Sequence, residues 1–250
     1  AMKVVLLGAT GATGCLLARQ LVAKKNHVTA IVRNTETEAL SGLSADHLKQ
    51  VRGTVLGMCD ESLEQLVQGC DAVLICLGHT ISFSGIFGKP RLLVTDTLKK
   101  IVKAVDAANK SENKIVKLVL MNSVGVRNKG LEEKHSVGEG ILLGLLYFLI
   151  PPHKDNVLAA DYLTDSIQKD TSCIEWVSVR PVTLIDESSE HTDYKLDPLR
   201  QQGVFFSSEQ TGRFQVAHFM SALIDDENLW KQWKGKTPVL SDASPEGSDT

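Results

Sequence analysis

The sequence predicts an α/β protein with a single Rossmann-type, doubly wound parallel sheet and helices on both faces. Short apolar runs alternate along the chain with segments whose apolar residues recur at helical spacing. This alternation is typical of right-handed strand–helix–strand crossovers and of parallel sheets covered on both sides. The 250 residues can form one full core, and neither an internal repeat nor a linker-like segment divides them.

The strands are predicted from their apolar runs. Most are apolar at consecutive positions, as expected for strands that are buried on both faces. The first run stops at Gly8 and the fourth at Gly78. The predicted strands are residues 3–7, 27–32, 51–56, 71–77, 114–121 and 174–179, with a short late strand at 238–240.

The predicted helices lie between these strands. They are residues 15–25, 60–68, 92–108, 156–167 and 214–224. Asp155 is expected to cap the helix that starts at Asn156, because Pro151 and Pro152 favour the end of the preceding segment.

The longest apolar stretch is residues 141–150, which is about half of what a membrane-spanning helix needs. We therefore expect a buried helix or a segment that covers a cleft, and no membrane partner. Residues 83–87 are a second candidate cover over a planar ligand. Plain core or surface packing is the alternative for both segments.

Charge and cysteine content narrow the choice of partners. Lys and Arg number 27 against 30 Asp and Glu, whereas nucleic-acid binders usually carry a basic excess. We therefore expect no nucleic-acid partner. The five cysteines form no CxxC pair, which favours reduced thiols in a cytoplasmic protein over a disulfide or a metal site. The N-terminal apolar run is too short for a signal peptide.

A glycine-rich turn, Gly8-Ala9-Thr10-Gly11-Ala12-Thr13-Gly14, joins the first strand to the first helix. In a dinucleotide-binding turn the first glycine permits the tight turn, the second lets the backbone approach a pyrophosphate, and the third lets helix and strand pack closely. The phosphates would sit at the helix N-terminus, where Thr10 and Thr13 could add hydroxyl donors. The alternative is a tight strand–helix turn without a ligand.

The end of the second strand indicates which dinucleotide is bound. NAD-preferring sites place Asp or Glu there to hold the ribose hydroxyls, whereas this chain has Arg33. A guanidinium fork suits a 2′-phosphate, so we expect NADP(H) to be preferred over NAD(H). A solvated arginine at a strand end is the alternative.

Together with the glycine-rich turn, three further segments resemble the atypical short-chain dehydrogenase/reductase superfamily. They are the ending Val32-Arg33, the run Gly69-Cys70-Asp71-Ala72-Val73 leading to Leu77-Gly78, and Val179-Arg180-Pro181. The resemblance is narrower to its NAD(P)H-binding group, which includes NmrA-like proteins and the NADPH-dependent flavin/biliverdin reductases. It covers about residues 2–225 and implies one NAD(P)-binding domain, residues 1–240, with a small C-terminal part over the substrate. Residues 241–250 are expected to form a flexible tail.

The resemblance assigns cofactor contacts residue by residue. The pyrophosphate turn is matched by Gly8, Thr10, Gly11, Ala12 and Thr13, and the 2′-phosphate contact by Arg33. Thr54 and Val55 fall beside adenine, where Thr54 replaces the usual Asp. Leu77 and Gly78 follow the adenosine ribose, Asn122 lies at the end of the fifth strand, and Pro181, Val182 and Thr183 flank nicotinamide.

The catalytic residues depart from the family pattern. Short-chain reductases use a Tyr and, four residues later, a Lys; here Pro152 and Asn156 occupy those positions. Ser123 matches the family's serine and could donate a hydrogen bond to a substrate, unless it only satisfies local backbone. His153 could supply a proton, unless it belongs to a solvated capping cluster, and His79 could face the cofactor.

Two functions remain open. Loss of the Tyr/Lys pair argues against ordinary ketone reduction but suits hydride transfer to a flavin, quinone or similar conjugated acceptor, since the proton can come from solvent. We therefore expect an NADPH-dependent oxidoreductase with a small-molecule acceptor, acting as a monomer or homodimer. The alternative is a non-catalytic NADP(H)-binding redox sensor or regulator, as in NmrA-like proteins. An epimerase is disfavoured, because little chain remains for a substrate domain.

Overall fold

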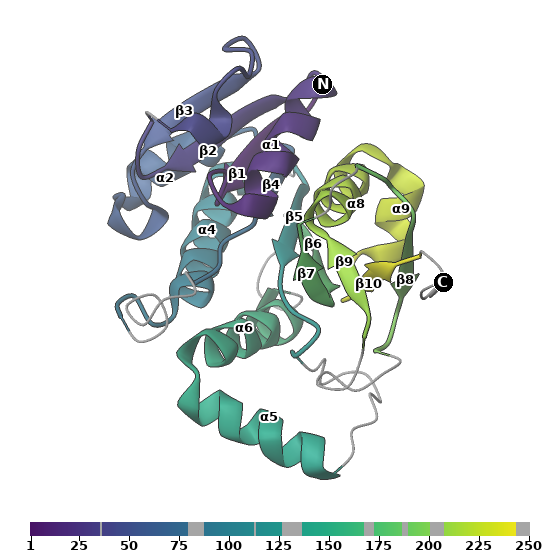
Figure 1. The fold of residues 1–250 in the computed structure, drawn as a ribbon. Coiled ribbons are helices and arrows are strands. Elements are labelled where there is room, and N and C mark those ends of the chain that lie inside the picture. The colour runs from purple at the N-terminus through teal and green to yellow at the C-terminus, as the bar shows by residue number, and fades with distance from the viewer. Residues whose placement is uncertain are drawn as a thin grey trace.

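The computed structural model describes residues 1–35, 37–79, 88–112, 114–126, 137–167, 173–186, 190–200 and 208–243. Its centre is an eight-stranded sheet with the order β3-β2-β1-β4-β5-β6-β10-β8 (Figure 1). Its strands are β1 (Lys3–Leu7), β2 (His27–Val32), β3 (Leu48–Arg52), β4 (Ala72–Ile75), β5 (Val116–Met121), β6 (Ile174–Pro181), β8 (Tyr194–Asp197) and β10 (Val239–Asp242).

The chain winds through this sheet in two directions, as predicted. It starts in the interior at β1, runs outward through β2 to β3, and returns to β4 on the other side of β1. All neighbouring pairs are parallel except β10 and β8. The point between β1 and β4 is therefore the switch point where doubly wound sheets bind their ligands, at the carboxyl ends of the strands. A small parallel sheet joins β7 (Thr183–Ile185) to β9 (Gln210–Gly212).

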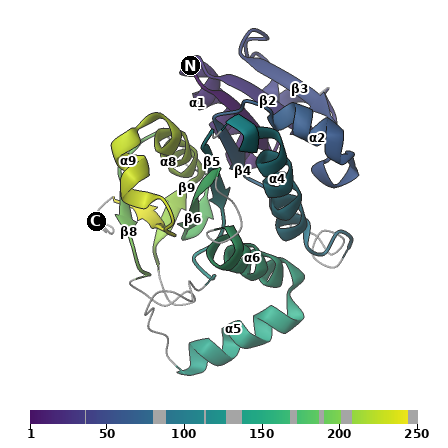
Figure 2. The ribbon, with the colours of Figure 1, turned by 180° about the vertical axis from the view of Figure 1, so that it is seen from behind.

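Helices cover both faces of the sheet (Figures 1 and 2). They are α1 (Ala12–Ala23), α2 (Asp60–Val67), α4 (Leu93–Asn109), α5 (Val137–Leu149), α6 (Pro151–Tyr162), α8 (Arg213–Asp225) and α9 (Glu227–Trp233). One apolar core contains Leu17 of α1 and Phe219 of α8. The core on the opposite face contains Leu63 of α2, Leu98 of α4 and Ala159 of α6. The predicted doubly wound α/β fold is confirmed.

The third strand lies earlier than predicted. It spans Leu48–Arg52, whereas the apolar pattern predicted residues 51–56. Gly53 has a φ of 152° and ends the strand. Thr54 then caps the short 3₁₀ helix η2 (Val55–Gly57), because its hydroxyl accepts a hydrogen bond from the Gly57 amide at 3.1 Å.

The helix predicted at residues 156–167 starts earlier. Pro151 and Pro152 open α6 instead of ending the previous segment, which is consistent with the tolerance of proline in the first turn of a helix. Asp155 is therefore inside α6 and does not cap it, so the capping prediction was wrong. At its other end α6 continues into one turn of π-helix, η4 (Leu163–Ile167).

The C-terminal edge of the sheet contains two features that periodicity did not predict. β8 pairs antiparallel with β10, which brings Tyr194 opposite Asp242 and Leu196 opposite Leu240. β10 thus extends to Asp242, two residues into the predicted tail, while residues 244–250 lie outside the described part of the chain.

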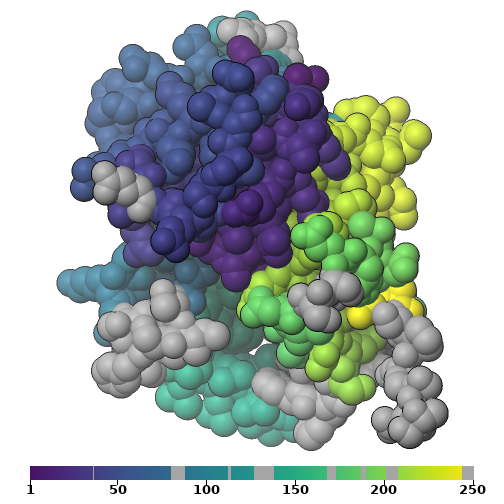
Figure 3. Space-filling view, turned by 45° about the horizontal axis from the view of Figure 1, so that its top comes forward, coloured from purple at the N-terminus to yellow at the C-terminus, as the bar shows by residue number. Residues whose placement is uncertain are grey.

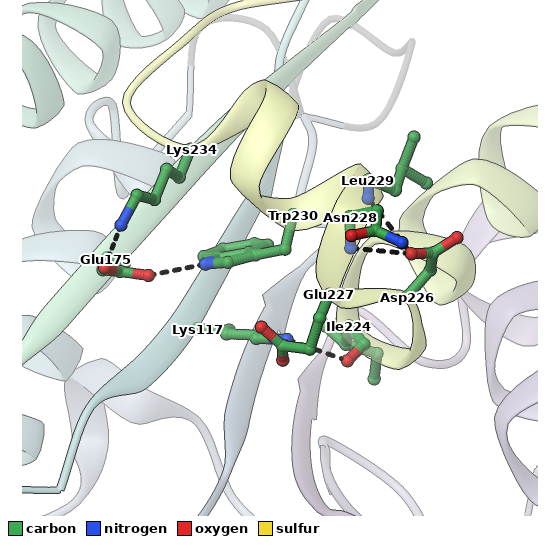
Figure 4. A network of polar contacts seen from close by, with 9 residues as sticks. All are labelled: Lys117, Glu175, Ile224, Asp226, Glu227, Asn228, Leu229, Trp230 and Lys234. Carbon is green, nitrogen blue, oxygen red and sulfur yellow. Dashed lines mark hydrogen bonds and ion pairs between the residues drawn. The ribbon is translucent and has the colours of Figure 1, made fainter.

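Polar contacts attach α9 to the strands below it (Figure 4). The indole N–H of Trp230 donates to Glu175 at 2.6 Å, and Lys234 donates to the same carboxylate at 2.7 Å. The ammonium of Lys117, in β5, donates to the Ile224 carbonyl at 3.1 Å and to Glu227. These contacts satisfy a buried lysine and fix the end of the chain that carries β10.

Among the described residues, no helix is long and apolar enough to cross a membrane.

Candidate functional site

The glycine-rich turn has the geometry that its sequence predicts. Gly8 has a φ of 80°, and a Cβ at this position would lie 2.5 Å from the Cys76 carbonyl oxygen in the neighbouring segment. A Cβ on Gly14 would lie 2.0 Å from the Gly8 carbonyl oxygen. Both positions therefore require glycine: the first for the turn, and the second for the close contact between α1 and β1.

The N-terminus of α1 is open at the carboxyl edge of the sheet. Gly11 is the N-cap, and no side chain among the described residues caps this end of α1. Thr10, Gly11 and Ala12 are exposed, so their backbone can be reached by an anion. Thr13 is 4% exposed, so most of this residue is covered by its neighbours.

The segment that follows β4 lies directly beside this turn. Gly8 approaches both the Cys76 carbonyl and the Leu77 amide. Leu77 is half-buried, whereas Gly78 is exposed, and no atom of the described residues lies within 4 Å of an ideal Cβ at Gly78. The structure thus brings together two predicted site segments that are far apart in the chain, and it leaves open space over Gly78 for a ligand.

The predicted adenosine contacts divide between surface and core. Arg33 is exposed immediately after β2. Thr54 is exposed, but its hydroxyl caps η2. Val55 is 5% exposed and belongs to the core that also contains Leu7 and Ile31, so it supports this edge from below.

Asn122 ties the end of β5 to α6. Its side-chain amide donates to the Asn156 carbonyl at 3.1 Å, and its side-chain oxygen accepts from the Ser123 amide at 2.9 Å. The Ser123 hydroxyl oxygen accepts from the Gly125 amide at 3.2 Å. This bond holds the hydroxyl in a local turn at the carboxyl edge. Since a hydroxyl is both donor and acceptor, Ser123 can still donate to a ligand.

The residues expected beside nicotinamide lie where β6 ends and β7 begins. Pro181 and Val182 are buried, and their backbone atoms bond to neighbouring segments: Val124 donates to Pro181, and Val182 donates to Leu240. Thr183 is exposed. Of these three residues, Thr183 presents the most surface to a ligand.

His153 lies in the first turn of α6 and is half-buried. Burial lowers the pKa of this imidazole below its ordinary value. His153 is therefore neutral at pH 7, which makes it a poor proton donor at that pH. Pro152 and Asn156, at the positions of the family's Tyr and Lys, are both half-buried in α6.

A pair that sequence reasoning did not connect lies between α6 and the loop after β4. The Nε2 atom of His79 is 2.9 Å from a carboxylate oxygen of Asp155, and their side chains are 7% and 0% exposed. The Asp155 carboxylate also accepts from the amides of Val94 and Thr95, each at 2.8 Å. Asp155 therefore caps α4, not its own helix. The partners are 76 residues apart, so no local pattern predicts the pair.

Helix α5 carries an exposed apolar surface. It packs against α6 and lies at the edge of the molecule, away from the central sheet (Figures 1 and 3). Its exposed large side chains are Ile141, Leu142, Leu145, Phe148 and Leu149, of which Phe148 is 82% exposed. This side of α5 is therefore not buried, which contradicts the expected buried helix. The second predicted cover, residues 83–87, lies outside the described residues.

Two further observations concern other parts of the fold. A cavity of about 260 Å³ lies at the amino ends of β1, β2 and β3, where His27 and His47 stack. It is at the opposite edge of the sheet from the glycine-rich turn.

All five cysteines are free thiols, and burial raises the pKa of Cys70 and of Cys76 to about 12, so both stay protonated. Across the described residues, no three His, Cys, Asp or Glu side chains gather as a metal site would require.

The fold and the open helix terminus define a dinucleotide-binding protein of the Rossmann type. A family model described as NAD(P)H-binding matches residues 8–227, and the chain belongs to this family. No curated protein matches the chain significantly.

Solved structures give the same fold at low sequence identity. A Rossmann-fold NAD(P)-binding family protein from Shigella flexneri is 21% identical, with a TM-score of 0.64, and the match covers 100% of this chain and 98% of that one. A wide-type short-chain dehydrogenase/reductase from Veillonella parvula, in complex with NADP, is 17% identical, with a TM-score of 0.67 and coverage of 98% and 96%. A protein from Streptococcus pneumoniae provisionally assigned as an NADH-flavin reductase is 14% identical, with a TM-score of 0.65 and coverage of 97% and 100%.

Proposed function

We propose that this protein is an NADPH-dependent oxidoreductase that transfers hydride to a flavin, a quinone or a similar conjugated small molecule. The observation that carries the proposal is the open glycine-rich turn at the switch point, combined with Pro152 and Asn156 where ketone reductases hold their Tyr and Lys. The first feature suits a dinucleotide, and the second leaves no Tyr/Lys pair to protonate an alkoxide.

The chain's own residues would hold the cofactor as follows. Backbone amides at Gly11 and Ala12 face the pyrophosphate, and Gly78 leaves room for the adenosine ribose. Arg33 meets the 2′-phosphate. Bound NADPH supplies the hydride. Ser123 donates a hydrogen bond to an oxygen or nitrogen of the acceptor, which stabilises the charge that hydride transfer places there.

The surroundings of the site support an apolar, planar acceptor. Helix α5, which carries an exposed apolar surface, packs against α6, the helix with the vacated Tyr and Lys positions. The structural neighbour from Streptococcus pneumoniae is provisionally assigned as a flavin reductase, and the one from Veillonella parvula holds NADP. Free cysteines are consistent with a reducing, cytoplasmic location.

The test is direct. Purified protein is mixed with NADPH and, in turn, with FMN, FAD and a series of quinones, and the loss of NADPH absorbance is followed. We expect turnover with at least one acceptor and a lower rate with NADH. The matched variant is Gly11→Ala, whose Cβ would lie 3.3 Å from the Gly8 carbonyl oxygen, a tight contact that requires a small local shift and narrows the phosphate site. It should weaken NADPH binding without unfolding the protein.

A non-catalytic sensor of the NADP(H) redox state is the second candidate. It is favoured by Pro152 and Asn156, which replace the Tyr/Lys pair, and by His153, whose burial lowers its pKa so that its charged form is scarce at neutral pH. Tight binding that discriminates NADPH from NADP⁺, together with no turnover on any acceptor, would establish the sensor and exclude the enzyme.

A further inference from the structure

β2 and β3 remain paired up to the carboxyl edge of the sheet. Val32, the last residue of β2, lies opposite Arg52, the last residue of β3. The pairing continues one residue further, since the Gly53 amide donates to the Val32 carbonyl at 2.8 Å. Arg33 follows Val32 directly, so Arg33 stands level with Gly53, one residue beyond Arg52 on the adjacent strand, and neighbouring strands are about 4.8 Å apart.

The alternation of side chains places Arg52 on the face of the sheet that α1 covers. Leu48, four residues earlier in β3, belongs to the core that contains Val32 and Leu17 of α1. Residues i and i+4 of a strand share a face, so Arg52 projects on the side of the sheet where α1 begins. This is the side on which the proposed pyrophosphate would lie.

The charged side chains at the carboxyl ends of β2 and β3 are both positive. Arg33 and Arg52 are both exposed, and neither forms an ion pair with a carboxylate in the part of the chain that the structure describes. Other basic side chains do find such partners, among them Lys24, Lys103 and Arg213. Two guanidinium groups without a carboxylate, on adjacent strand ends, match an anion that carries two negative charges.

We propose that Arg52 is a second specificity-determining residue, which binds the 2′-phosphate of NADP(H) together with Arg33. The inference rests on the proposed function, because it assumes that adenosine lies over the ends of β2 and β3. It adds a residue from a strand that carries no cofactor-specificity signal in the sequence. Two planar guanidinium groups can contact the phosphate from different sides, whereas a single arginine contacts it from one side only.

The experiment measures binding only, so it does not depend on turnover. NADPH and NADH are titrated by fluorescence into the wild type, Arg52→Ala, Arg33→Ala and the double variant. Adenosine 2′,5′-bisphosphate and adenosine 5′-monophosphate serve as competitors that differ in the 2′-phosphate. Lys49→Ala is the matched control: an exposed cation on the same strand, away from the carboxyl end.

We expect Arg52→Ala to weaken NADPH and the bisphosphate about tenfold or more, as for the loss of a hydrogen bond to a charged group. NADH and the monophosphate should change less than twofold, and Arg52→Lys should recover part of the loss. Lys49→Ala should leave all four affinities unchanged. Circular dichroism melts check that Arg52→Ala is folded.

The outcomes separate this inference from the proposed function. If Arg33→Ala removes the preference for NADPH and Arg52→Ala does not, the second arginine is not a determinant although the cofactor assignment holds. Equal losses of NADPH and NADH in Arg52→Ala would also overturn the inference. A wild type that binds neither dinucleotide would overturn the proposed function and the inference with it.

Discussion

Asp155 of α6 joins His79 to the amino end of α4 through one buried carboxylate. Its oxygens lie 2.9 Å from the His79 Nε2 and 2.8 Å from the amides of Val94 and Thr95. The Thr95 hydroxyl in turn donates to the Asp155 carbonyl at 2.8 Å. A negative charge at a helix N-terminus is stabilised by the helix dipole, and here it also orients an imidazole beside the candidate site.

Removing this carboxylate should destabilise the fold. In Asp155→Ala the two amides of α4 and the imidazole lose their acceptor inside the protein, so we expect the free energy of unfolding to fall by about 3 kcal/mol. His79→Ala removes one of these bonds and should cost about 1–2 kcal/mol. Urea unfolding measures both. Asp165→Ala, an exposed carboxylate in η4, is the control and should change stability little; equal effects of Asp155→Ala and Asp165→Ala would contradict the capping role.

Substitution of Gly14 and of Gly144 by alanine should change stability in opposite directions. A Cβ on Gly14 meets the Gly8 carbonyl oxygen at 2.0 Å, so Gly14→Ala should lower stability by about 2 kcal/mol or more. No atom of the described residues lies within 4 Å of a Cβ on Gly144 in α5, so Gly144→Ala should raise stability by up to about 1 kcal/mol through helix propensity. Thermal melts compare the two. A stable Gly14→Ala that binds NADPH normally would refute the close contact of α1 and β1.

The contact between Glu175 and α9 should make stability depend on pH. Partial burial alone would raise the pKa of Glu175, but the hydrogen bonds from Lys234 and Trp230 outweigh it and hold the pKa below the ordinary 4.5. A carboxyl whose pKa is lowered in the folded state stabilises the fold at pH values above its ordinary pKa. This contribution disappears as the pH falls from the ordinary pKa through the pKa of the folded state.

Glu175→Gln tests this dependence. Its melting temperature should lie below that of the wild type at pH 7, and the difference should shrink as the pH falls below about 4.5. Glu190→Gln, at an exposed position, should show no such trend. A difference that stays constant from pH 7 to pH 3 would mean that packing, and not charge, accounts for the loss.

Substitutions of Ser123 can distinguish a structural role of its hydroxyl from a chemical one. Its hydroxyl oxygen accepts from the Gly125 amide, a bond that Ser123→Thr can keep and Ser123→Ala cannot. If the hydroxyl also donates to the acceptor, kcat should fall about tenfold or more in Ser123→Ala and recover in Ser123→Thr, while the affinity for NADPH stays unchanged. Unchanged turnover in Ser123→Ala would restrict this serine to closing its turn.

Much of the fold could be predicted because its signals are local. A buried parallel strand is a run of apolar residues, and the requirements for Gly8 and Gly14 follow from backbone geometry that any such turn must satisfy. The same holds for Arg33, which could be placed at the edge of the sheet by counting from the turn.

The remaining features depend on contacts between distant segments. Asp155 has the composition of an N-cap next to prolines, but the amides that it caps belong to α4. The alignment of Arg52 with Val32 follows from strand register, which depends on both faces of the sheet and on Gly53. β8 was not predicted, because it is a short, partly buried strand at the edge of the sheet and its sequence pattern resembles that of a loop.

The order of strands at the C-terminal edge also constrains how the protein is made. β10 lies between β6 and β8 in the sheet, although it is the last of the three to be synthesised. Until β10 has been made, β8 lacks the strand that it pairs with in the described sheet, and the side of β6 that β10 will occupy is an unprotected strand edge. Pairing of β8 therefore waits until β10 has been made, and a truncation before β10 would leave the facing edges of β6 and β8 without this strand.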